Sequence, residues 1–243
     1  MDYLMLVRVA PDATPTTDDS DPEDWVERTT TDGTRLFGER LQPAEEATTV
    51  RVRDGHVLLT DGPFAEVHEQ VAGFDLLRVR SRGEAVDVAS AHPVAGFGAL
   101  ELRELWPFGS GDGLALAPDA PARARYLLVM VDESADGSAH GGPPGAGPAE
   151  EGGRPDAWIA EMARRDVDEG GARLRPPSEA VTVRRTGGEV VVTDGPFAEL
   201  REQVAGYQLL SVADLDDALA AAAAHPAAGP GGAIEVRALW PVD

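Results

Sequence analysis

The stretch Thr60-Asp-Gly-Pro-Phe-Ala-Glu66 organises the whole chain, because the chain contains it a second time at residues 193–199. At a constant offset of 133, residues 60–79 and 193–212 agree at 15 of 20 positions. A matching tryptophan, a matching Arg-Leu-x-Pro run and a matching Ala-His-Pro step extend the similarity in both directions. This period is far longer than the roughly 20–50 residues of solenoid repeats, so it indicates two whole domains.

The predicted domain boundaries follow from this duplication. We expect a first domain at residues 1–108, a linker at 109–124 that is rich in Gly, Asp, Ala and Pro, and a second domain at 125–243. The second copy also carries a Gly/Pro-rich insert at residues 134–155. Each domain is long enough to bury a hydrophobic core without metals or disulfides.

Composition excludes several classes of function. The formal net charge is −22, and a protein that binds phosphates needs positive charge on its contact face, so we expect no nucleic-acid and no membrane partner. The chain has no cysteine, which rules out disulfides and thiolate chemistry. No signal peptide or long apolar run is evident, which predicts a cytoplasmic protein. All 21 basic residues are arginine, which GC-rich codon usage or a salt-loving organism would each explain.

Two alternating runs within residues 48–60 are joined by Asp54-Gly55, which is a strong signal for a two-residue β-hairpin. The second copy keeps the hairpin with Gly187-Gly188 at its tip.

The remaining elements follow the same order in both copies. The patterns predict, in the first copy, strands at 3–9, 36–41, 73–79 and 99–106 and helices at 22–31 and 82–91. The second-copy counterpart of the first helix is expected at 155–169, stopped by Gly170-Gly171. This order predicts an α+β fold with helices on one face of a mainly antiparallel sheet.

The motif, the hairpin before it and the Glu-Gln-Val-Ala-Gly run after it resemble the YCII-related family, in its DGPF-motif branch. The resemblance covers nearly all of both copies. It implies two tandem ferredoxin-like domains whose antiparallel sheets pack as a pseudo-dimeric α+β barrel. One chain would then supply both halves, as an intramolecular pseudo-dimer, and the sequence leaves any further oligomeric state open.

The resemblance also implies two kinds of activity. Some YCII members are linked to small aromatic or lactone chemistry through a His-Asp pair, with the histidine on or near the first helix. Neither residues 22–31 nor residues 155–169 contain a histidine. Genes for DGPF proteins often neighbour those for extracytoplasmic-function sigma factors, which implies a regulatory role.

Four residues are candidate acid/base groups: Asp61, Asp194, His92 and His225. The alternative for the aspartates is a rigid Asp-Gly-Pro-Phe turn that the carboxylate pins, with the phenylalanine as a core plug. The alternative for the histidines is a structural role at a helix C-terminus, with bonds to the last carbonyls. His56, His68 and His140 are expected at the surface.

Arg51 and Arg184 are candidate substrate-binding residues, because a guanidinium fork can hold an anionic group. In a chain this acidic, the alternative is an ion pair with a nearby carboxylate such as Glu66, Glu69 or Glu101, and the same applies to the last-strand arginines 103 and 237. The four tryptophans are expected as core or interface anchors. No motif indicates a cofactor or a metal site.

Two functions therefore stand side by side. The first is a small-molecule-binding α+β protein with acid/base chemistry on a small anionic or aromatic compound. The second is a non-catalytic interaction module with a protein partner, for example a sigma factor. The sequence leaves open whether the protein is an enzyme.

Overall fold

The repeats are built from four α-helices and twelve β-strands, here described in a computed structural model for residues 1–15, 22–65, 69–106, 123–133, 155–197 and 203–240. The helices are α1 (Pro22–Thr31), α2 (Arg82–Ser90), α3 (Asp156–Arg164) and α4 (Leu215–Ala224). The strands of the first repeat are β1 (Asp2–Val9), β2 (Arg35–Arg40), β3 (Thr48–Arg53), β4 (His56–Asp61), β5 (Gln70–Arg78) and β6 (Ala99–Glu104). Those of the second repeat are β7 (Ala124–Asp132), β8 (Asp168–Arg173), β9 (Val181–Thr186), β10 (Glu189–Asp194), β11 (Gln203–Val212) and β12 (Gly232–Ala238).

Two predicted segments lie almost wholly outside the described residues. Of the predicted linker at 109–124 only the last two residues are described, and of the predicted insert at 134–155 only Pro155. None of the described helices has the length and apolar character needed to cross a membrane.

The chain forms two compact units, and each unit takes strands from both repeats. Unit 1 comprises Met1–Leu41, Val67–Leu105 and Arg175–Glu199, and its sheet has the strand order β10-β9-β6-β1-β5-β2. Unit 2 comprises Gln42–Glu66, Trp106–Leu174 and Leu200–Asp243, with the order β4-β3-β12-β7-β11-β8. Each repeat has therefore given its hairpin to the sheet of the other repeat, an exchange that the sequence analysis did not predict.

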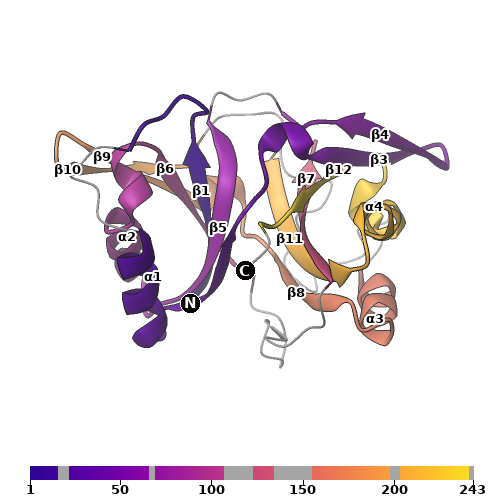
Figure 1. The fold of residues 1–243 in the computed structure, drawn as a ribbon, viewed down its shortest axis with the longest axis horizontal. Coiled ribbons are helices and arrows are strands. Elements are labelled where there is room, and N and C mark those ends of the chain that lie inside the picture. Colours follow the sequence, from indigo (N-terminus) through magenta and orange to yellow (C-terminus); the bar gives the residue numbers. More distant parts are fainter. Residues whose placement is uncertain (16–21, 66–68, 107–122, 134–154, 198–202, 241–243) are drawn as a thin grey trace. The chain divides into compact units, whose positions relative to one another are not determined.

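The predicted fold class is confirmed. Each unit is a six-stranded antiparallel sheet with two helices on one face, as expected for tandem ferredoxin-like domains (Figure 1). Each sheet is open, with an edge strand at either end of its strand order. The packing of the two sheets into one barrel stays a prediction.

The core of unit 1 lies between the sheet and its helices. The side chains of Tyr3, Met5 and Val7 alternate along β1 and join one apolar cluster with Trp25 of α1. The Trp25 side chain is 1% exposed, and its indole N–H donates to the carbonyl of Val88 in α2 (3.2 Å). The predicted inward packing of this tryptophan is confirmed, and the contact ties the two helices together.

Unit 2 repeats this core. Trp158 of α3 is buried, and its indole N–H donates to the carbonyl of Ala221 in α4 (2.9 Å). Trp240, expected as an anchor, is 42% exposed.

Both predicted hairpins are confirmed, including their tips. Asp54 and Gly55 have φ values of 52° and 76°, and Gly187 and Gly188 have 61° and 84°. Positive φ at both loop positions is the requirement of a two-residue type I′ turn. The helix expected at 22–31 and the helix ends at the two His-Pro steps are confirmed as well.

The prediction that the third helix runs to residue 169 is wrong, because α3 ends at Arg164. Asp166 adopts a left-handed φ of 54°, and the N–H of Val167 returns to the carbonyl of Met162 (3.2 Å), which is a Schellman-type helix end. The glycine at 171, expected as part of the stop signal, lies in β8. A Cβ there would be 2.5 Å from the carbonyl oxygen of Tyr207, so glycine is required by the close approach of β11.

Gly38 occupies the equivalent place in β2, and its substitution by alanine is expected to destabilise the protein by about 1–3 kcal/mol through overpacking. The added Cβ would be 2.0 Å from Oδ1 of Asp75 and 2.7 Å from the carbonyl oxygen of Phe74. The Asp75 carboxylate cannot yield easily, because the Arg35 guanidinium holds it at 2.6 Å. Urea unfolding measures the loss.

The matched control is Gly83→Ala in α2. A Cβ at Gly83 would meet only Oγ of Ser81, at 3.7 Å, and alanine favours a helix. Equal losses for the two variants would contradict the packing argument.

Candidate functional site

The Asp-Gly-Pro-Phe corner of the first repeat is pinned by its own hairpin. Gly62 has a φ of +91°, donates its N–H to the carbonyl of Ala47 (2.8 Å), and accepts the hydroxyl of Thr49 at its carbonyl (3.0 Å). The second corner repeats this geometry with Gly195, Ala180 and Thr182. Both corners are turns, as one of the two interpretations of the motif predicted, but a backbone N–H and a threonine hydroxyl hold each turn in place of the aspartate carboxylate that the sequence analysis expected.

The aspartates of both corners turn toward solvent. Asp61 is exposed at the end of β4. The Asp194 side chain is 84% exposed and forms an ion pair with Arg82 of α2. Both carboxylates are accessible, and their role as acid/base groups stays a prediction.

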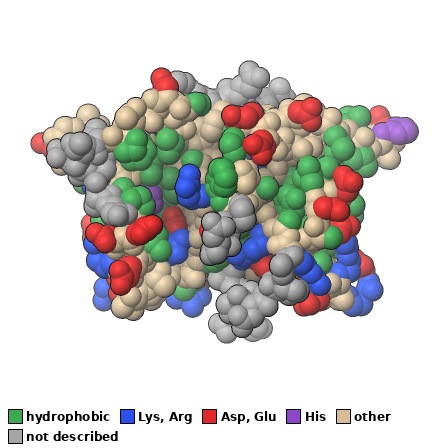
Figure 2. Space-filling view, viewed as in Figure 1, with side chains coloured by type: hydrophobic (Ala, Val, Ile, Leu, Met, Phe, Trp, Pro, Cys, Tyr) green, Lys and Arg blue, Asp and Glu red, His purple; other side chains and the backbone are tan. Residues whose placement is uncertain are grey.

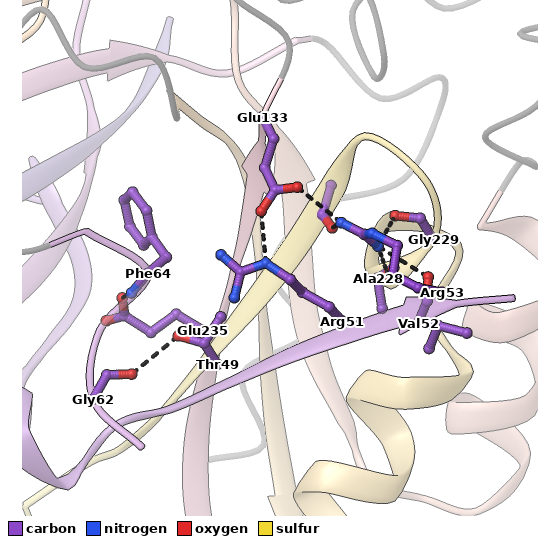
Figure 3. A network of polar contacts seen from close by, with 11 residues as sticks. Thr49, Arg51, Val52, Arg53, Gly62, Phe64, Glu133, Ala228, Gly229 and Glu235 are labelled. Carbon is purple, nitrogen blue, oxygen red and sulfur yellow. Dashed lines mark hydrogen bonds and ion pairs between the residues drawn. The ribbon is translucent and has the colours of Figure 1, made fainter. Parts of the chain in front are cut away.

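The phenylalanine of each corner is held by the last strand of the other repeat. The backbone N–H of Phe64 donates to Oε2 of Glu235 in β12 (3.0 Å), as Figure 3 shows. Glu235 is buried and also accepts from the Arg237 guanidinium (3.0 Å). This buried carboxylate fastens the exchanged hairpin to unit 2.

In unit 1 the corner phenylalanine is held in the same way, but the buried carboxylate there pairs with two arginines. Phe197 donates its N–H to Oε2 of Glu101 (3.4 Å), and Glu101 pairs with both Arg8 (3.0 Å) and Arg103 (3.3 Å). Burial alone would raise the pKa of Glu101, but the two guanidinium groups and the Phe197 N–H outweigh it and lower the pKa. Glu101 is therefore a buried anion at neutral pH.

The Phe197 ring, expected as a core plug, is half-buried beneath positive charge. The guanidinium carbon of Arg8 lies 5.3 Å from the ring centroid and that of Arg184 lies 5.0 Å from it. These distances allow cation–π attraction. In the second repeat Val131 stands where Arg8 stands in the first, so the two units differ here.

Both candidate substrate-binding arginines take part in ion pairs. Arg184 pairs with Glu69 (2.5 Å), which confirms the predicted carboxylate partner. Arg51 pairs with Glu133 (2.6 Å), which the sequence analysis did not single out, and Arg53 pairs with the other oxygen of the same carboxylate (2.8 Å; Figure 3). Their role as clamps for an anionic substrate stays a prediction.

The candidate histidines His92 and His225 are buried at equivalent places. The Nδ1 of each accepts an N–H from the short helical turn that follows, from Val94 (3.1 Å) and from Ala227 (3.0 Å). The sequence analysis expected these rings to bond the last carbonyls of the preceding helix. In the contacts described here the imidazole Nδ1 is an acceptor, so they are not the expected bonds. The signal for it was the His-Pro step, since proline begins the following turn.

The rings also pack on the core tryptophans. The centroids of His92 and Trp25 are 4.5 Å apart, and those of His225 and Trp158 are 4.7 Å apart, both edge to face. Burial, reinforced by the charge of Arg35, lowers the pKa of His92 to about 4. His92 is therefore neutral near pH 7.

The exchange of hairpins decides which candidates share a unit. Asp194 shares unit 1 with His92, and Asp61 shares unit 2 with His225. Among the described residues, no hydrogen bond or ion pair joins Asp194 to His92. His56 lies exposed at the start of β4, whereas His68 and His140 lie outside the described residues.

Comparison with known proteins identifies the family to which the chain belongs. An uncharacterized protein of Rhizobium meliloti (strain 1021) is 48% identical over 69 residues, which make up 28% of this chain and 56% of that protein. The chain thus matches little more than half the length of that relative. The model of the YCII-related domain matches residues 1–109 and again residues 155–243. This double match spans most of the two repeats, and the chain belongs to the YCII-related domain family.

Proposed function

We propose that this protein is a non-catalytic interaction module that docks a strand of a partner protein on the outer edges of its two hairpins. One observation carries the proposal. Within the described residues, β4 pairs only with β3 and β10 pairs only with β9, and all six residues of each edge strand are exposed. Three consecutive aliphatic side chains on each edge are 45–54% exposed: Val57, Leu58, Leu59, Val190, Val191 and Val192.

Such edges are unusual, because natural sheets protect them with lysine, proline or a bulge. Neither aliphatic run contains such a residue. The β3 strand pairs with β12 over three residues and with β4 over six, so the hairpin reaches beyond its neighbour. Figure 2 shows hydrophobic side chains at the surface along this hairpin. An extended peptide can add to a sheet edge of this kind through main-chain hydrogen bonds.

The state of the other candidate groups supports a non-catalytic role. His92 is buried and neutral, and Arg51 and Arg184 are each held by a carboxylate. The family resemblance suggests an extracytoplasmic-function sigma factor as the partner.

Co-purification from the native host tests the proposal. We expect the wild-type chain to retain a specific partner that the double variant Leu58→Asp plus Val191→Asp loses, because a carboxylate in each run prevents strand addition. The matched control is Leu215→Asp, which changes an exposed leucine at the start of α4. Identical partners for the wild type and the double variant would contradict the proposal.

A second candidate function is supported by the corner of unit 1. The Arg184 side chain is 36% exposed over the Phe197 ring, in the same unit as the exposed Asp194 carboxylate. We propose that this arrangement binds a small anionic or aromatic compound. In unit 1 the groups of this proposed site are Asp194, His92 and Arg184, and their counterparts in unit 2 are Asp61, His225 and Arg51.

A thermal-shift screen with small carboxylates, phenols and lactones tests this second function. A ligand at about 100 times its dissociation constant stabilises by roughly 2.7 kcal/mol, which corresponds to a shift of several degrees at about 2–4 °C per kcal/mol. The shift is expected to vanish in the double variant Asp61→Ala plus Asp194→Ala. A shift that persists there would show binding elsewhere, and a flat screen would end this candidate.

A further inference from the structure

We infer that the Asp-Gly-Pro-Phe corner of unit 1 binds an aromatic monocarboxylate, and that the buried guanidinium of Arg8 supplies the positive charge that selects it. The inference rests on the second proposed function in taking this corner as a ligand site, and it names the ligand class and the unit. The groups that carry it all belong to unit 1: Arg8, Glu101, Arg103, Arg184 and Phe197.

Two buried cations share one buried anion in this corner. Arg8 and Arg103 are 7% and 1% exposed, and both pair with Glu101, which is 1% exposed. Within the part of the chain that the structure describes, neither arginine forms an ion pair with a second carboxylate. Burial lowers the pKa of Arg103, an effect that Glu101 opposes and the charge of Arg8 reinforces. The three side chains therefore carry one positive charge in excess, and a buried charge without a counter-ion is unfavourable.

The equivalent place in unit 2 has no such excess. Val131, which is buried, stands in β7 where Arg8 stands in β1. Among the described residues, Glu235 forms an ion pair with Arg237 alone. The same strand arrangement thus forms around one carboxylate and one guanidinium, so a requirement of the fold does not account for Arg8. A ligand of unit 1 that carries a negative charge does account for it.

Arg184 offers the contact that a ligand carboxylate needs. Glu69 accepts from both terminal nitrogens of its guanidinium, Nη1 (3.1 Å) and Nη2 (2.5 Å), and the carbonyl of Gly98 also accepts from Nη1 (3.2 Å). No hydrogen bond between described residues uses Nε, and the Arg184 side chain is 36% exposed. A guanidinium has a second pair of donors along its Nε side, so this edge can hold a further carboxylate.

The Phe197 ring favours an aromatic group on that carboxylate. The guanidinium carbons of Arg8 and Arg184 both lie within 5.3 Å of the ring centroid, so the excess charge and the open edge meet at the same ring. The ring is half-buried, which leaves part of it available to a planar apolar group. Aromatic pairs gain from offset or edge-to-face packing beyond the area that they bury.

Charge selects a monoanion over a neutral compound or a dianion. The attraction between a buried charge and a nearby anion is screened less than that between two exposed charges. One carboxylate balances the one charge in excess. A dianion would add a negative charge that this corner does not neutralise, in a chain whose formal net charge is already −22.

Sodium benzoate tests the inference, with benzamide as its uncharged counterpart, in a titration followed by backbone amide NMR. Benzoate is expected to shift resonances of β6 and β9 in unit 1 and to leave those of β3 and β12 in unit 2 unchanged. Benzamide is expected to bind about tenfold more weakly or less, because it lacks the charge. Equal affinities for the two compounds, shifts confined to unit 2, or no binding of benzoate would overturn the inference.

Variants of Arg8 separate its charge from its packing. Arg8→Met keeps the length of the side chain without the charge and is expected to weaken benzoate binding about tenfold or more, whereas Arg8→Lys keeps the charge and most of the affinity. Arg8→Val, which copies Val131 of unit 2, is a second uncharged variant. The control is Arg28→Ala, which removes an exposed charge from α1 and is expected to leave binding unchanged. Full affinity in the uncharged variants, or equal losses in Arg8→Met and Arg8→Lys, would overturn the inference.

These outcomes are distinguishable from failure of the second proposed function. A phenol or a lactone that stabilises the wild type but not the Asp61→Ala plus Asp194→Ala variant would retain that function, even if benzoate did not bind. A flat thermal-shift screen, with no response to benzoate, would end both.

Discussion

Replacement of Glu101 by alanine is expected to destabilise unit 1 by about 3–5 kcal/mol, because removal of one partner from a buried ion pair leaves an uncompensated buried charge. Two guanidinium groups lose their partner here, those of Arg8 and Arg103, which are 7% and 1% exposed. The backbone N–H of Phe197 loses its acceptor as well. The variant is therefore expected to loosen the exchanged β9–β10 hairpin.

Hydrogen exchange followed by mass spectrometry is the suitable measurement, since it resolves the two units. Peptides from β6, β9 and β10 are expected to exchange faster in Glu101→Ala, with smaller changes in unit 2. The control is Glu235→Ala, at the equivalent place in unit 2, where a single ion pair to Arg237 is at stake. We expect a smaller loss there. A larger loss for Glu235→Ala would contradict the role given to the second arginine.

Local structure was predictable because the repeats supply two copies of each signal. Asp54-Gly55 and Gly187-Gly188 both indicate a two-residue turn, and both adopt it. The helix at Pro22–Thr31 has acidic residues in its first turn, where they favour a helix start. These signals depend only on residues that are neighbours in the sequence. They therefore predict the turn and the helix regardless of which distant segments pack together.

No local signal in the sequence indicates the exchange of hairpins. The alternation of residues 48–53 is the same whether the hairpin joins the sheet of its own repeat or of the other. The contact that decides between them, from the N–H of Phe64 to the carboxylate of Glu235, joins residues 171 positions apart. The corner phenylalanine and the glutamate that holds it occur in both repeats. The sequence therefore does not show whether each hairpin joins the sheet of its own repeat or that of the other.

The end of α3 was predicted wrongly because a glycine after a helix can have either of two structural reasons. Glycine after a helix usually marks its end, and Gly170-Gly171 stood at a plausible distance. Here Asp166 takes the left-handed position instead, and the glycine at 171 serves the approach of β8 to β11. Glycine is common both after a helix and where two strands approach closely, and the sequence alone does not separate the two uses.

The site was predictable only as a list of residues. The recurrence of Asp61, Asp194, His92 and His225 identified them, but recurrence is equally the mark of a structural role. The structure places the aspartates at the surface and the histidines against tryptophan rings. Burial depends on packing across the unit, so the sequence could not show it.

Protonation of His92 is expected to make the stability of unit 1 depend on pH. The pKa of His92 is lowered to about 4 in the folded chain from an ordinary value of 6.5, first by burial and then by the charge of Arg35. Between these values the unfolded chain binds a proton that the folded chain does not, so stability falls as the pH falls. The stability that the neutral His92 ring contributes is fully present above pH 6.5, and it is lost by pH 4. The loss amounts to about 3 kcal/mol at 1.36 kcal/mol per unit of pKa.

The variant His92→Asn isolates this effect. Asparagine does not titrate, and as a favoured N-cap residue it can accept the Val94 N–H in place of Nδ1. The carboxylates of the chain titrate in both proteins, so their effect cancels when the unfolding free energies are subtracted at each pH. The advantage of the wild type over His92→Asn is expected to shrink by about 3 kcal/mol between pH 7 and pH 4. A difference that stays constant over this range would mean that the ring is accessible to protons in the folded chain, and such access would restore His92 as a candidate for proton transfer.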